Sequence, residues 1–195
     1  LPAAVGAVIV WWVADDLTAM RAAALERHAA SAALSAAEVT AVAERVRSGK
    51  AKSGEIYAFF RNPLCPPDLL AAHVDSPDIY ARTAIASNTA IDPALAAKLL
   101  GDADEQVRGY LAFNRSLPPE ILVRLAADSS EDVRDGVAWT PTLPDEAFAK
   151  LVTDPSAKVR ATVARQSRLT PEQAERLLND PVESVRNAAN WRWGR

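Results

Sequence analysis

Arginine recurs along this 195-residue chain at a spacing of 26 residues, and an aspartate recurs with it. The guanidinium group is a planar fork of donors that suits carboxylates, phosphates and clustered carbonyl oxygens. Such a row could form ion pairs between neighbouring units, or it could bind a run of phosphates. The arginines are Arg82, Arg108, Arg134, Arg160 and Arg186, and the aspartates are Asp102, Asp128, Asp154 and Asp180.

The shared period of the two residue types favours a structural role. Because the acidic residue repeats with the arginine, we predict a ladder in which each arginine reaches the aspartate or the turn carbonyls of the adjacent unit. A glutamate follows Asp102, Asp128 and Asp180 by three residues, the spacing of a helix capping box. We therefore expect these aspartates to cap the helix that carries the arginine.

A second set of residues at the same period could bind a partner. Position 139 lies on the side of its helix opposite Val133 and Val137, at 100° per residue. Exposed aromatic rings with an interspersed cation suit a peptide- or base-binding surface. Alternatively, each ring folds over the following turn and only packs between repeats. The predicted binding residues are Tyr110, Phe113, Trp139, Arg165 and Trp191.

No arrangement typical of a catalytic site occurs in the sequence. The two histidines, His28 and His73, have no metal-ligand spacing, and there is no glycine-rich phosphate loop. Cys65 and His73 fall where other copies carry apolar residues, which predicts that both belong to the core. We therefore expect no enzyme activity, no metal and no cofactor. The single cysteine is typical of a reducing compartment and indicates a cytoplasmic protein.

The repeating unit itself predicts two short helices. A proline stands near the start of each copy, as at Pro93 and Pro119, where it fits the first turn of a helix. Valine or another apolar residue then recurs at four-residue steps, as at Val133 and Val137. Self-similarity at this period is typical of a solenoid. The predicted fold is an all-α solenoid of about five to six repeats.

The repeats also predict how the chain is divided. Residues 1–33 are expected to form an N-terminal helical cap, 34–61 a degenerate first repeat, 62–191 five 26-residue repeats, and 192–195 a C-terminal tail, all within one elongated domain. The apolar run 1–14 is shorter than the roughly 20 residues that a bilayer-spanning helix needs. We expect it to cover the first repeat rather than cross a membrane.

The run from Val159 to Pro181, with its Val-Arg, Leu-Thr-Pro and Asp-Pro elements, resembles the leucine-rich repeat variant family of bacterial proteins. More distantly, the Asp-x-x-x-x-Val-Arg element resembles HEAT repeats. The resemblance implies a right-handed superhelix in which α-helices alternate with short 3₁₀- or α-helices. One branch of that family carries a cysteine-bound iron–sulfur cluster before its repeats. This chain has no cysteine upstream of Cys65, so the cluster is not carried over.

Charge is distributed unevenly and leaves the partner open. Residues 66–157 contain 7 Lys/Arg against 15 Asp/Glu, whereas residues 158–195 contain 8 against 4. We expect a non-catalytic scaffold that binds a protein or peptide along its concave face. The alternative is a nucleic-acid-binding solenoid that uses the basic C-terminal third. A third possibility is an assembly domain of a longer polypeptide, and the oligomeric state stays open.

Overall fold

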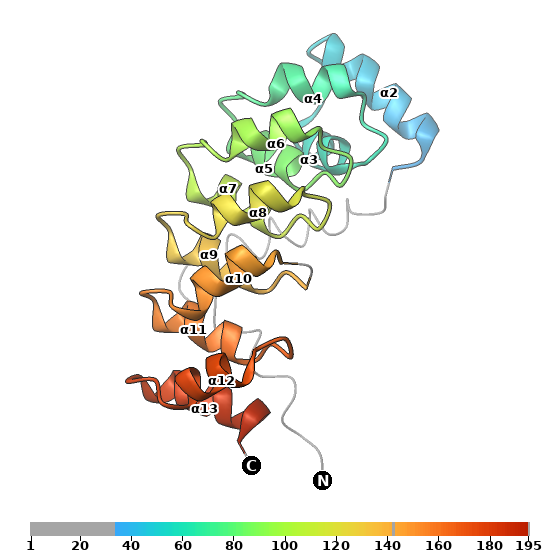
Figure 1. The fold of residues 1–195 in the computed structure, drawn as a ribbon. Helices are drawn as coiled ribbons and strands as arrows, with labels where there is room; N and C mark the ends of the chain where they lie inside the picture. Colours follow the sequence, from blue (N-terminus) through green and yellow to red (C-terminus); the bar gives the residue numbers. More distant parts are fainter. Residues whose placement is uncertain (1–33, 142, 195) are drawn as a thin grey trace. The chain divides into compact units, whose positions relative to one another are not determined.

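The structure is a computed structural model that describes residues 34–194 except Thr142 (Figure 1). The predicted N-terminal cap and the apolar run 1–14 lie outside the described residues. The chain divides into two compact units, residues 1–59 and 60–195, which are treated separately below.

The first unit contains α2 (Ala36–Arg47) and most of α3 (Ser53–Arg61). Helix α2 begins with a capping box, in which Ser35 Oγ accepts from the Glu38 backbone N–H and the Glu38 carboxylate accepts from the Ser35 N–H. Arg45 then joins α2 to α3 through two hydrogen bonds to the Glu55 carboxylate, at 3.0 and 3.2 Å. This two-helix arrangement lies where the sequence predicts a degenerate repeat.

The second unit is a stack of five helix pairs. The first helices of the pairs are α4 (Pro67–His73), α6 (Pro93–Leu99), α8 (Pro119–Leu125), α10 (Asp145–Val152) and α12 (Pro171–Leu178). The second helices are α5 (Ile79–Ala86), α7 (Glu105–Ala112), α9 (Glu131–Ala138), α11 (Ala157–Ala164) and α13 (Glu183–Trp193). Every second helix is an α-helix, and α13 continues through Trp193, two residues into the expected tail.

Proline and polar caps start the first helices. Pro93 and Pro171 each occupy the first turn, where a backbone N–H would have no partner within the helix, so its absence in proline costs nothing. Asp92 caps the Ala94 N–H, and Thr170 forms a capping box with Gln173. Local sequence therefore sets where each of these helices begins.

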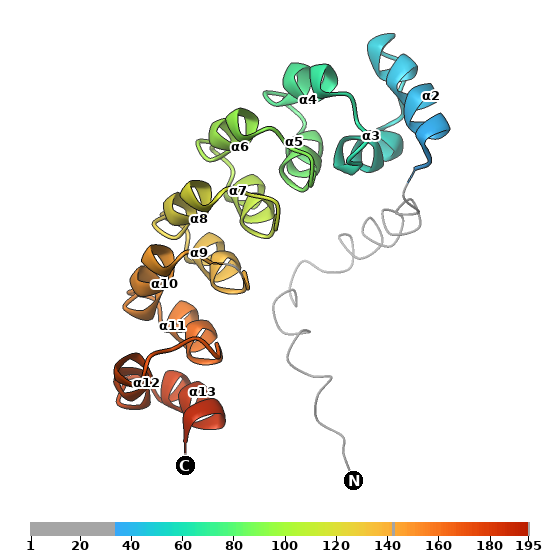
Figure 2. The same cartoon turned by 45° about the vertical axis from the view of Figure 1, so that its right-hand side comes forward.

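The pairs form two layers. The first helices lie on the outer side of a curve and the second helices on its inner side (Figure 2). Each second helix packs on the second helix of the next pair, as α7 does on α9 and α9 on α11. The first helices supply fully buried leucines and the second helices fully buried valines, as with Leu125 on α8 and Val133 and Val137 on α9, which packs on α8. The predicted all-α solenoid of two-helix repeats is confirmed.

The predicted core positions of Cys65 and His73 can also be placed. Cys65 is buried, and burial raises the pKa of its thiol to about 12, so the thiol stays protonated. The His73 ring is half-buried and lies 4.9 Å from the Phe60 ring, centroid to centroid. Over the part of the chain that the structure describes, no helix has the length and hydropathy to cross a membrane.

Candidate binding face on the inner helices

The inner helices carry most of the exposed large apolar side chains. Of the seven such side chains in the described residues, five belong to this layer, and two, Leu64 and Val182, stand in turns before helices. Those on the inner layer are Tyr80, Tyr110, Phe113, Trp139 and Trp191. Exposure of this kind is typical of a surface that meets a partner.

Four residues at one repeat position form what we name the aromatic row: Phe113, Trp139, Arg165 and Trp191. The first three are the C-cap residues of α7, α9 and α11, and Trp191 lies near the end of α13. Because successive inner helices pack side by side, these four positions follow one another along the same edge of the layer. Phe113 is 60% exposed, Trp139 52% and Trp191 78%.

Phe113 is supported from one side by the next repeat. A Cβ placed on Gly136 would lie 3.3 Å from Cε2 and Cζ of the Phe113 ring, so the ring lies against the backbone of α9. Packing on the following repeat therefore helps to orient the ring. Most of its surface stays open to solvent all the same.

A polar cluster lies beside Trp139. Asp135, one turn earlier on α9, accepts a 2.6 Å hydrogen bond from Thr162 Oγ1 on α11, and the Trp139 side chain lies close enough to lower the pKa of Asp135. Lys158 Nζ lies 2.6 Å from Asp132 Oδ1 and 3.8 Å from Asp135 Oδ2. Burial raises the pKa of Asp135 and the nearby Asp132 adds to this, against the lowering effect of Thr162 and Lys158. Asp135, the polar neighbour of Trp139, is thus held by two residues of the next repeat.

Arg165 occupies the row position between the two tryptophans. It is exposed, and no ion pair or side-chain hydrogen bond joins it to another residue within 34–194. Its guanidinium can therefore pair with an incoming carboxylate or stack on an incoming ring.

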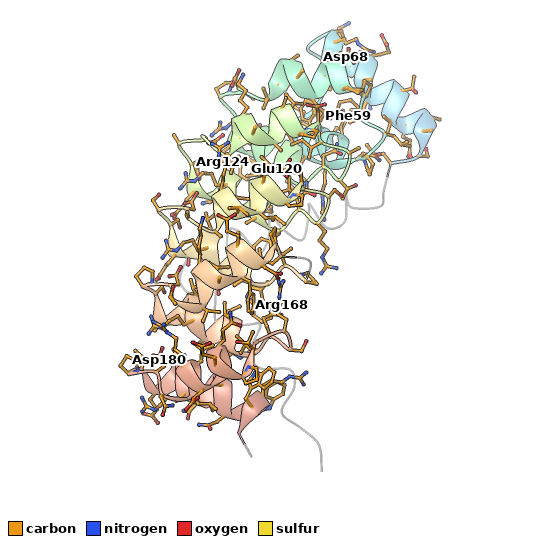
Figure 3. The ribbon with its side chains drawn as sticks, viewed as in Figure 1. Phe59, Asp68, Glu120, Arg124, Arg168 and Asp180 are labelled. Atoms are coloured by element: carbon orange, nitrogen blue, oxygen red, sulfur yellow. The ribbon has the colours of Figure 1, made fainter. Side chains whose placement is uncertain are left out.

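The ladder arginines form a different arrangement at the opposite ends of the inner helices. Arg134 Nε and Nη2 donate to the two carboxylate oxygens of Asp154 in the next repeat, at 2.7 and 3.0 Å. Its Nη1 donates at 2.7 Å to the carbonyl of Asp128 in its own repeat. The same bidentate geometry joins Arg82 to Asp102, Arg108 to Asp128 and Arg160 to Asp180. Asp180 is labelled in Figure 3, at the turn before α13.

These pairs shift the pKa of the four arginines and of two of the aspartates, Asp128 and Asp180. Hydrogen bonding to the aspartate raises the pKa of each of the four arginines. The hydrogen bond from Arg160 lowers the pKa of Asp180. Burial acts to raise the pKa of Asp128, but hydrogen bonds from Arg108 and the Ser130 backbone outweigh it and leave that pKa lowered. The carboxylates of Asp128 and Asp180 are therefore ionised at neutral pH.

The expected capping boxes at these aspartates are wrong. Helix α7 is capped by Asp104, and α9 begins after Ser130, two residues beyond Asp102 and Asp128 respectively. Each ladder aspartate instead accepts from the N–H two residues ahead, as Asp128 Oδ1 does from Ser130 at 2.8 Å. This turn shifts the helix start, because the carboxylate must face the arginine of the preceding repeat.

A second ladder was not foreseen in the sequence. Asn114 is buried, and its Nδ2 donates at 2.8 Å to the carbonyls of Ala86 and of Asn88, after the preceding inner helix. Asn88 makes the same two bonds one repeat earlier, and Gln166 makes one, to Ala138. The signal that could have revealed it is the recurrence of an amide side chain at the 26-residue period.

Within 34–194, no cluster of three or more His, Cys, Asp or Glu residues could hold a metal ion. The two ladders and the aromatic row thus account for the recurrent polar and aromatic features of the inner layer. Fold and face together define an α-solenoid of helical repeats with a partly aromatic inner surface.

Comparison with solved structures gives a more specific likeness. The chain is similar to a protein described as "a leucine-rich repeat variant with a novel repetitive protein structural motif", with a TM-score of 0.56 and 29% sequence identity. The match covers 72% of this chain and 56% of that protein, so the chain spans little more than half its length. No family model matches, and neither does any curated protein. The predicted likeness to the leucine-rich repeat variant is confirmed.

Proposed function

We propose that the chain is a non-catalytic scaffold that binds an extended protein segment along its inner helices. Tyr110 and the aromatic row, from Phe113 to Trp191, form the binding surface. The observation that carries the proposal is the concentration of exposed rings on one layer, while most other large apolar side chains in the described residues are buried. Phe113 lies against the neighbouring repeat and should lose little conformational entropy on binding, which makes it an effective anchor.

The row also suggests which segment would fit. Arg165 supplies a cation between Trp139 and Trp191, so an acidic side chain flanked by apolar ones matches the row. The acidic groups nearest to Trp139 are already engaged, since Asp132 pairs with Lys158 and Asp135 with Thr162. Because they are paired, these two carboxylates would repel an acidic segment less strongly than unpaired carboxylates would.

Several basic residues of the C-terminal third already form contacts within the chain, which favours a protein partner over a nucleic acid. Arg160 pairs with Asp180, and Lys158 pairs with Asp132. Arg168 donates to Asp145 and to the Leu143 carbonyl, with its guanidinium 4.5 Å from the Phe148 ring centroid. Much of the basic charge of the C-terminal third is therefore held in internal contacts and contributes less to phosphate binding. Arg168 is labelled in Figure 3.

A reducing compartment such as the cytoplasm fits the same proposal. Cys65 is the chain's single cysteine and lies in the core, where an oxidising environment would give it no intramolecular partner.

The proposal is tested by selecting random displayed peptides on the wild-type chain and measuring their affinity for variants by calorimetry. The double variant Phe113→Ala, Trp139→Ala should weaken binding by about tenfold or more. Truncating an aromatic anchor to alanine commonly reduces the binding free energy by about 2 kcal/mol or more. Leu64→Ala is the matched control, since it removes an exposed apolar side chain outside the row. Equal loss in the double variant and in the control, or a lowered melting temperature without loss of affinity, would contradict the proposal.

A gentler variant tests the orientation of the Phe113 ring. Gly136→Ala places a methyl group 3.3 Å from the ring and should displace it, weakening peptide binding without removing any side chain. Gly109→Ala is the control on α7, where an added methyl meets nothing within 4 Å. The nucleic-acid alternative would be favoured if the chain bound DNA or RNA with steep weakening by added salt.

A further inference from the structure

The fifth ladder arginine differs from the other four. Arg82, Arg108, Arg134 and Arg160 each use Nε and Nη2 to grip a carboxylate of the next repeat. The remaining nitrogen, Nη1, donates to a carbonyl six residues earlier, at 2.7 or 2.8 Å. Each guanidinium thus makes two kinds of contact. Its Nη1 bonds to a carbonyl of its own repeat, and its Nε and Nη2 bind the aspartate of the next repeat.

Arg186 keeps the anchoring edge. Its Nη1 donates to the carbonyls of Asp180 at 2.7 Å and Pro181 at 2.9 Å. Arg160 makes the equivalent bonds to Asp154 at 2.8 Å and Pro155 at 3.0 Å. Because the anchor is the same to within 0.1 Å, the Arg186 guanidinium takes the orientation that binds an aspartate elsewhere in the array. Within 34–194, no acceptor lies on its Nε and Nη2.

The neighbouring turn also differs from its counterparts. The position two residues after the ladder aspartate is polar in the preceding repeats, where it is Asp104, Ser130 or Ser156. In the last repeat it is Val182, which is 37% exposed and caps the start of α13. An exposed apolar side chain four residues before Arg186, whose backbone N–H bonds to the Val182 carbonyl, suits a protein surface better than a small anion.

We propose that Arg186 is a binding site for a carboxylate presented by an aspartate turn of another polypeptide segment. Its Nε and Nη2 bind the two carboxylate oxygens, as Arg160 binds Asp180, and Val182 packs on the incoming turn. The site is separate from the aromatic row and does not depend on the function proposed for it. Its ligand is the kind of turn that closes each internal repeat, in which the aspartate also accepts from the N–H two residues ahead.

The experiment follows the Nε–H signals of the arginines by ¹H–¹⁵N NMR in the full chain. The probe is acetyl-Asp-Pro-Ser-amide, which reproduces the chain's own turn at Asp154, and the control probe carries Asn for Asp. We expect the Arg186 signal to shift saturably, the Arg160 signal to stay in place, and the Asn probe to bind about tenfold more weakly or worse, because a charge-assisted hydrogen bond is lost.

Three comparisons make the result decisive. Arg186→Lys keeps the charge but not the fork, so it should lose most of the affinity while the other ladder signals report an intact fold. Inorganic phosphate should bind more weakly than the aspartate probe, whereas tighter binding would indicate a general anion site. No shift of the Arg186 signal, or equal shifts with the Asp and Asn probes, would overturn the proposal.

Discussion

At the scale of single residues, four of the ladder arginines each join two repeats through a carboxylate that is itself largely buried. The Asp154 side chain is only 3% exposed, so its carboxylate has little access to water once Arg134 is gone. An isolated buried charge is far more costly than an exposed one, which distinguishes the ladder from the surface ion pairs of this chain.

Arg134→Ala should therefore lower the free energy of unfolding by about 3 kcal/mol, because it leaves a buried carboxylate unpaired. Arg165→Ala is the matched control and should change it by less than about 0.5 kcal/mol, since Arg165 is exposed. Urea denaturation of both variants measures the difference. Similar losses in the two would show that the ladder contributes no more than a surface charge.

The pKa values of two aspartates in the array should be shifted in opposite directions from the ordinary value for aspartate. The pKa of Asp135 is raised by burial, so its ionisation weakens the fold as the pH rises through that pKa. The pKa of Asp180 is lowered by Arg160, so its contribution to stability is lost as the pH falls through that pKa. Carboxyl ¹³C NMR should place the Asp135 midpoint above about 3.9 and that of Asp180 below it.

The opposite pKa shifts of Asp135 and Asp180 also predict opposite pH dependences for the stability of their asparagine variants. From about pH 3 to about pH 7, the stability of Asp135→Asn relative to wild type should rise, and that of Asp180→Asn should fall. Parallel slopes for the two variants would contradict the assignment of opposite pKa shifts.

At the scale of elements, the inner helices are tied to one another at both ends. The arginine–aspartate pairs join the turns before these helices, and the asparagine side chains join the turns after them. A helix of eight residues is too short to be stable alone, so these ties and the packing between layers determine its register.

Thr140 is the weak member of the asparagine ladder. Its Oγ1 reaches only the Ala112 carbonyl, at 3.4 Å, whereas Asn114 makes two bonds of 2.8 Å. Thr140→Asn should add a bond to the Asn114 carbonyl and raise the free energy of unfolding by about 1 kcal/mol, a typical net value for a hydrogen bond. Thermal or urea unfolding measures this gain. A loss of stability would mean that the turn after α9 has no room for the longer side chain.

How far the sequence predicts these features depends on whether they repeat. The 26-residue spacing of Arg134 and its counterparts pointed to the two-helix unit, because every copy must present the same packing surface. The amide at Asn114 also repeats, but asparagine is common in turns for local reasons, so its period alone does not distinguish long-range bonds from local ones. The contact between Asp135 and Thr162 occurs in one seam only, and no period could reveal it. The position of Phe113 on Gly136 likewise required the register between α7 and α9.

At the scale of the whole stack, residues 60–194 are held by contacts between neighbouring pairs. Inner helices pack on the next inner helix, and the two ladders span no more than adjacent repeats. Stability in such an array is approximately a sum over repeats and their interfaces. Removal of one end should therefore shorten the structure rather than abolish it.

Deletion of residues 166–195 tests this additivity. The deletion removes α12, α13 and the Asp180 partner of Arg160, and it uncovers the apolar face of α11. The shortened chain should keep nearly the same helical ellipticity per residue, while its denaturant m-value falls in proportion to the surface no longer buried and its midpoint decreases. Arg160→Gln in the full chain is the control that removes the ion pair but keeps the repeat. Because the contacts are local, the seam between α7 and α9 should retain its protection from hydrogen exchange in the shortened chain. Loss of that protection would show that the stack folds as one indivisible unit.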